Sequence, residues 1–95
     1  MSVTVKIPAA LRAYTDGLSD LALEGQTVGQ IIDALVERYP DLGPHLKDDD
    51  GQLQSFVNVF VGSKNVKNSG GILAAVPDGE TLMLVPAIAG GSGDN

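Results

Sequence analysis

The feature that most constrains the fold of this chain is an amphipathic segment between Thr27 and Pro40. Thr27 is a good helix N-cap, and Pro40 ends the helix at or before Tyr39. The apolar side chains between them fall on one stripe at helical spacing: Val28, Ile31, Ile32, Leu35, Val36 and Tyr39. This is the clearest helical repeat in the chain. It predicts one well-formed helix, with the stripe packed into a core against other elements.

The other apolar segments have the patterns of β-strands. Residues 3–7 alternate apolar and polar side chains, and Pro8 ends this strand. Residues 11–17 are expected to be a connecting turn, and residues 18–23 form a second short strand, antiparallel to the first. Residues 55–61 are rich in β-branched and aromatic side chains, a short returning strand is expected at residues 66–67, and the last strand follows the Pro77-Asp-Gly79 turn.

This order predicts an α+β domain with a mixed sheet of four to five strands and one main helix across one face. If the first and last strands are neighbours, the arrangement is the ubiquitin-like β-grasp fold. The domain is expected to span residues 1–87, followed by a flexible tail at residues 88–95.

Residues 41–54 are polar and irregular, with a short helical turn expected around Leu42–Leu46. The acidic run Asp48–Asp50 lacks the alternating oxygen ligands of a calcium loop, so a solvated loop is expected there and no metal site. His45 has no evident partner and is expected to be a surface loop residue.

Composition excludes several classes of function. The 95 residues suffice for one domain, and the absence of cysteine excludes disulfides, thiolate zinc sites and a cysteine nucleophile. A formal net charge of −6, with no cluster of Lys and Arg, argues against nucleic acid as a partner. The charge favours a partner with a basic docking surface, or serves only solubility.

The N-terminal residues alternate instead of forming a signal peptide, and no apolar stretch approaches the roughly 20 residues of a membrane helix. We therefore expect a cytoplasmic protein with no membrane contact.

The C-terminal segment Glu80–Gly91 is an apolar strand that continues through Pro86 into a thin arm of small residues ending in Gly90-Gly91. Such an arm has little to bury and is expected to be presented to a partner. Phe60, Met83 and Val85 are expected on the sheet face opposite the helix. They form an apolar docking patch beside the arm, or are covered by a neighbouring loop.

The chain resembles the MoaD/ThiS family of ubiquitin-like sulfur carriers over residues 2–91. The resemblance rests on the order of elements and on four segments: Phe56-Val-Asn-Val-Phe-Val61, Ser69-Gly-Gly71, Pro77-Asp-Gly79 and Leu84-Val-Pro-Ala-Ile-Ala-Gly-Gly91. Within the family, these motifs are most similar to the carrier of an alternative route of cysteine biosynthesis, and next to the small subunit of molybdopterin synthase.

The resemblance implies a protein co-substrate and not an enzyme, with no cofactor of its own. An E1-like adenylyltransferase of the MoeB/ThiF type would adenylate the carboxylate of Gly91, and a sulfur donor would displace AMP to leave a thiocarboxylate. The slim residues Ala89 and Gly90 suit a narrow channel to the ATP site. The sulfur acceptor would be an enzyme of the cysteine synthase type or the large subunit of molybdopterin synthase.

The tail departs from the family pattern, because Ser92–Asn95 follow the Gly-Gly pair where family members usually end. The sequence therefore predicts a precursor that a peptidase, of the JAMM metalloprotease type, cuts after Gly91. Two other functions stay open: a ubiquitin-like protein modifier, and an interaction module in which the Gly-Gly pair is incidental.

Overall fold

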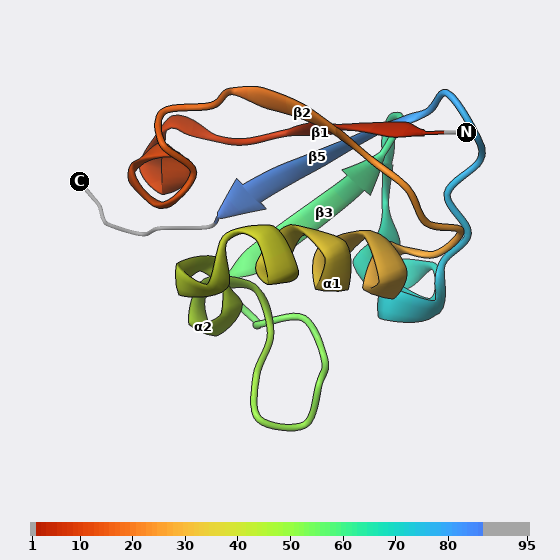
Figure 1. Cartoon of the computed structure of the whole chain (residues 1–95). Helices are drawn as coiled ribbons and strands as arrows, with labels where there is room; N and C mark the ends of the chain where they lie inside the picture. The colour runs from red at the N-terminus through yellow and green to blue at the C-terminus, as the bar shows by residue number, and fades with distance from the viewer. Residues whose placement is uncertain (1, 87–95) are drawn as a thin grey trace.

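The computed structural model describes residues 2–86 (Figure 1). The boundary expected at residue 87 and the tail at 88–95 lie outside these residues. The strands are β1 (Val3–Lys6), β2 (Asp20–Leu23), β3 (Val57–Val61), β4 (Lys64–Asn65) and β5 (Thr81–Pro86). The helices are α1 (Val28–Arg38) and α2 (Gly43–Leu46). Short 3-10 helices are η1 (Ala9–Tyr14), η2 (Pro40–Leu42), η3 (Val66–Asn68) and η4 (Gly71–Leu73).

The strands form one mixed sheet in the order β2-β1-β5-β3-β4. The first and last strands are parallel neighbours at the centre, and each is flanked by an antiparallel strand. Helix α1 crosses one face of this sheet (Figure 1). The expected β-grasp arrangement is therefore confirmed.

The core lies between α1 and the sheet. It includes Ile31, Ile32 and Leu35 of the helix stripe, which are fully buried. On the facing sheet, alternate residues of β1, β3 and β5 are buried with them: Val3, Val5, Val57, Val59, Leu82 and Leu84. The period of two therefore directs one face of each strand to the core and the other face away from α1.

Both ends of α1 agree with the sequence-based expectation. The Thr27 hydroxyl accepts a hydrogen bond from the Gln30 N–H at 3.2 Å, which satisfies one of the free donors of the first turn. At the other end, the Tyr39 N–H donates to the Leu35 carbonyl at 2.9 Å before Pro40 begins η2.

The short returning strand differs from its prediction. It was expected at residues 66–67, but β4 is Lys64–Asn65, and Val66 begins η3 instead. Gly62 has a positive φ of 62°, so a tight turn at residues 62–63 brings the chain back two residues earlier. Val66 is 1% exposed and belongs to the core, but it lies in a 3-10 turn. The prediction was wrong because a buried valine is equally typical of a strand.

His45 also differs from its prediction. It lies in α2, not in a loop, and its ring stacks on Tyr14 of η1 with centroids 4.5 Å apart. The segment around η1, which the sequence suggested was a connecting turn, is thus a six-residue helix held against α2.

Within residues 2–86, no helix is long and apolar enough to cross a membrane.

Candidate docking surface beside the C-terminal arm

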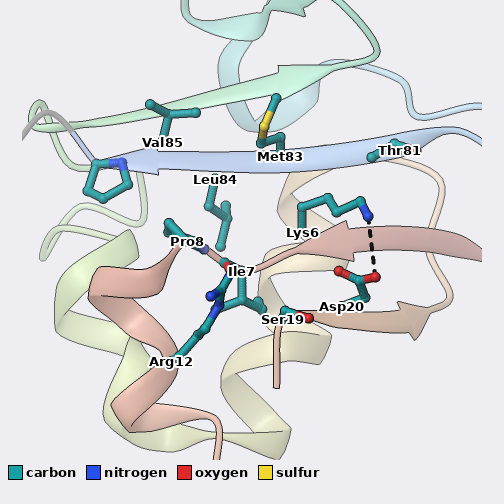
Figure 2. Close-up of a pocket in the computed structure, with 11 residues that line it drawn as sticks. Lys6, Ile7, Pro8, Arg12, Ser19, Asp20, Thr81, Met83, Leu84 and Val85 are labelled. Carbon is teal, nitrogen blue, oxygen red and sulfur yellow. Dashed lines mark hydrogen bonds and ion pairs between the residues drawn. The ribbon is translucent and has the colours of Figure 1, made fainter. Parts of the chain in front are cut away.

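The sheet face opposite α1 carries the apolar residues that the sequence placed there. Met83 pairs directly with Phe60 across β5 and β3, and Val85 pairs with Asn58. Met83 and Val85 project from one side of β5, and Leu84 projects from the other (Figure 2). Their expected outward orientation is confirmed, and we call Phe60, Met83 and Val85 the outer patch.

The outer patch is partly exposed to solvent. Met83 is 41% exposed, although it lies on a central strand, and Phe60 and Val85 are half-buried. Phe56, which precedes β3, is a further exposed aromatic residue at 43%. The exposure of Met83 and Phe56 is what an apolar docking patch requires.

Across this face, the strand register aligns one residue from each strand in a row. In the order of the sheet, the row is Asp20, Lys6, Met83, Phe60 and Asn65. It begins with an exposed ion pair, in which Lys6 Nζ lies 3.3 Å from Asp20 Oδ2. Because both side chains are about half exposed, this pair adds little to stability. The outer face is therefore apolar in the middle and polar at both edges.

Beside the outer patch lies a groove of about 680 Å³ between the second half of β5 and the start of η1 (Figure 2). It opens where β1 leaves β5, because their pairing stops at Lys6 and Met83. Pro8 and Arg12 line one wall, and Val85 and Pro86 line the other. The groove thus adjoins the point where the chain continues from β5 into the arm.

Pro8 accounts for the end of the ladder. Thr4 donates to the Glu80 carbonyl at 3.1 Å, so alternate residues 80, 82 and 84 direct their backbone groups toward β1. The next donor for the Leu84 carbonyl would be the N–H of residue 8, which proline lacks. Strand β1 therefore supplies no donor to the carbonyl of Leu84, a residue that lines the groove.

Ala89, Gly90 and Gly91 lie outside the described residues. The structure places only the root of the arm, where Pro86 is the last residue of β5 and pairs with Val57.

Within the described residues, the structure contains no cluster of three or more His, Cys, Asp or Glu side chains that could bind a metal ion. Asp48 stabilises the loop in which it lies, because its Oδ1 accepts hydrogen bonds from the N–H groups of Asp50 and Gln52. What these residues offer is therefore a partly exposed apolar sheet face and the root of an arm.

This combination defines a class of protein: a β-grasp domain with a partly exposed apolar sheet face beside the root of its C-terminal arm. The model of the ThiS family matches residues 5–91 and thus ends on the second glycine of the Gly-Gly pair. The chain therefore belongs to the ThiS family of ubiquitin-like sulfur carriers, which are small protein co-substrates and not enzymes.

The similar proteins match almost the whole chain. The sulfur carrier protein CysO of Mycobacterium tuberculosis is 39% identical over 93 residues, covering 96% of this chain and 100% of the relative. A putative sulfur carrier protein of Archaeoglobus fulgidus is 34% identical with the same coverage of both chains. Among solved structures, CysO in the Amycolatopsis orientalis BexX/CysO complex has a TM-score of 0.87 and 42% identity, over 94% of this chain and 99% of that one.

Sequence reasoning missed Arg12 as a residue of this surface. Arg12 is the only charged residue of the Ala9–Tyr14 segment. That segment belongs to a predicted turn with no periodic pattern, so no sequence signal indicated Arg12. Pro8 was recognised as the end of a strand, but only the structure shows that the ladder opens into a groove at that point.

Proposed function

We propose that this protein carries sulfur as a thiocarboxylate on Gly91 and donates it in the biosynthesis of cysteine. The observation that supports this most directly is the family match ending at Gly91, together with near full-length similarity to CysO carriers. The β-grasp body serves as a handle that an E1-like adenylyltransferase holds at the outer patch. Because adenylation of Gly91 consumes ATP, we expect the protein to act in the cytoplasm.

The chemistry explains why the arm is slim. A carboxylate is a poor electrophile, so one oxygen of Gly91 first attacks the α-phosphate of ATP and releases pyrophosphate. A sulfur nucleophile then attacks the carbonyl carbon of the resulting anhydride, and AMP leaves. Gly90 and Gly91 have no Cβ, and so they can pass through a narrow channel to the buried ATP site. No acid or base of the carrier itself is required.

The residues after Gly91 add one step before activation. Ser92 follows Gly91 directly, so the carbonyl of Gly91 is part of a peptide bond until the chain is cut. We propose that a peptidase of the JAMM metalloprotease type removes residues 92–95.

Transfer to an acceptor tests the cysteine assignment. Carrier trimmed to Gly91 and loaded with labelled sulfide is mixed with a cysteine-synthase-type enzyme from the same organism and a serine derivative activated at its hydroxyl group. The labelled sulfur should replace the activated oxygen substituent and form labelled cysteine, or a carrier-bound cysteine. If the label is instead accepted only by a molybdopterin synthase large subunit, the carrier belongs to molybdenum cofactor synthesis and the cysteine proposal fails.

A second function, protein modification, is favoured by one comparison. Small archaeal modifier protein 3 of Haloferax volcanii is 32% identical over 65 residues, covering 68% of this chain and 70% of the relative. In this case, Gly91 would be joined to lysine side chains. Isopeptide-linked peptides ending in Gly90-Gly91, detected by mass spectrometry of cell extracts, would establish it.

A further inference from the structure

The groove beside the outer patch contains a positive charge that the fold holds in place. Arg12 is half-buried at the end of η1, and its Nε–H donates to the Ile7 carbonyl at 3.0 Å. That bond uses one of the five N–H donors of the guanidinium. Among residues 2–86, neither of the two ion pairs includes Arg12. Its remaining donors thus have no carboxylate partner in the described part of the chain.

The backbone of Arg12 is fixed as well. Its carbonyl accepts hydrogen bonds from the N–H groups of Thr15 at 3.1 Å and Gly17 at 2.9 Å. The chain turns back to make these bonds through two left-handed residues, Asp16 with φ 57° and Gly17 with φ 84°. A left-handed conformation is uncommon for a residue with a side chain. The turn thus holds Asp16 in an uncommon conformation. Arg12 is fixed both at its side chain, by the Ile7 carbonyl, and at its own carbonyl, by Thr15 and Gly17.

The same end of η1 is also anchored to α2, because the ring of Tyr14, its last residue, packs on His45. The guanidinium is therefore preorganised, so little conformational entropy of the Arg12 side chain is lost when a ligand binds to it. Around it, the groove is lined by Pro8, Leu84 and Val85, and farther along by the Lys6–Asp20 ion pair. Such a site suits an extended peptide segment with one carboxylate and a nearby N–H donor.

We infer that Arg12 binds a carboxylate side chain of the E1-like partner, whose acidic segment lies in this groove while the outer patch makes the apolar contact. This inference rests on the proposed function, and it assigns local charge complementarity that the net charge of −6 conceals. The net charge favours a partner with a basic docking surface, and the inference adds to it an acidic segment beside the apolar contact.

Binding of the carrier, trimmed to Gly91, to the adenylyltransferase of the same organism tests the inference. Because hydrogen bonds between charged groups are strong, Arg12→Gln should weaken the affinity at least about tenfold. Arg12→Lys should recover part of the loss, since it keeps the charge without the planar fork. The matched control is Arg38→Gln, which removes the same charge from the exposed side of α1 and should change the affinity less than about twofold.

Partner variants identify the contact. Among Asp→Lys and Glu→Lys substitutions on the adenylyltransferase, one should restore binding of Arg12→Glu and not of Phe60→Asp. If Arg12→Gln does not fold, Arg12→Lys is compared with Arg38→Lys instead. A loss of affinity for the adenylyltransferase is then expected for Arg12→Lys and not for Arg38→Lys.

The inference is overturned if Arg12→Gln binds as tightly as Arg38→Gln. It is also overturned if Arg12→Gln binds more tightly than the wild type, because the groove would then hold residues 87–95 of its own chain. Failure of the proposed function looks different, since the trimmed wild-type chain would then be neither bound nor adenylated.

Discussion

Neighbouring residues of β5 have opposite roles, and the exposed fraction of each side chain separates them. Leu84 is 1% exposed and packs in the core, whereas Met83 beside it is 41% exposed on the outer face. Leu84→Ala should lower the free energy of unfolding by about 2–5 kcal/mol, because it leaves a cavity. Met83→Ala, the control on the same strand, should cost less than about 1 kcal/mol. Urea denaturation measures both, and equal losses would contradict the assignment of the two faces.

Phe60 provides the corresponding test of the outer patch. Phe60→Asp places a charge opposite Met83 and should abolish adenylation by the E1-like enzyme while the domain stays folded. Leu73→Asp is the matched control, since Leu73 is 79% exposed on η4 and lies outside the outer patch. Pyrophosphate release measures both variants. Adenylation of Phe60→Asp at the wild-type rate would remove the patch from the docking surface.

At the scale of elements, α1 depends on its first turn. Thr27→Ala removes the acceptor of the Gln30 N–H and should cost about 1 kcal/mol of unfolding free energy. Thr27→Ser keeps a hydroxyl and should restore most of the loss. The midpoints of urea unfolding, followed by far-ultraviolet circular dichroism, give the comparison. An alanine variant as stable as the serine variant would show that the cap contributes nothing.

Elements with a complete hydrophobic period were predictable from sequence, and elements set by tertiary contacts were not. Helix α1 and strands β1, β3 and β5 each show their buried face as a repeat of 3.6 or two residues. In contrast, β4 has two residues, too few for a period, and the buried Val66 next to it resembled a strand residue. The contact of His45 with Tyr14 joins residues far apart in sequence, so no local pattern could indicate it.

The same distinction holds for the site. The outward positions of Phe60, Met83 and Val85 follow from strand alternation and could be predicted. The groove could not, because it depends on where β1 and β5 separate and on the side-chain anchor of Arg12. Both are properties of the assembled sheet.

At the scale of the whole molecule, the core of the described residues is complete without the tail, because its members run from Val3 to Leu84 in the sequence. Removing these four residues should therefore leave the urea midpoint unchanged, even though the proposed function requires their removal for activation. Thermal and urea unfolding of the full-length and trimmed chains make this comparison. A large loss of stability on trimming would contradict the separation of body and tail.

The central claim is that the sulfur is carried on the C-terminal carboxyl carbon of Gly91. One measurement tests this claim most directly. Full-length and trimmed chains are incubated together with the E1-like adenylyltransferase, ATP and sulfide, and the products are analysed by intact and tandem mass spectrometry. The account predicts that one oxygen is replaced by sulfur at Gly91 of the trimmed chain and that the full-length chain is unchanged. Sulfur on the untrimmed chain, or its absence from the trimmed chain, would contradict the account.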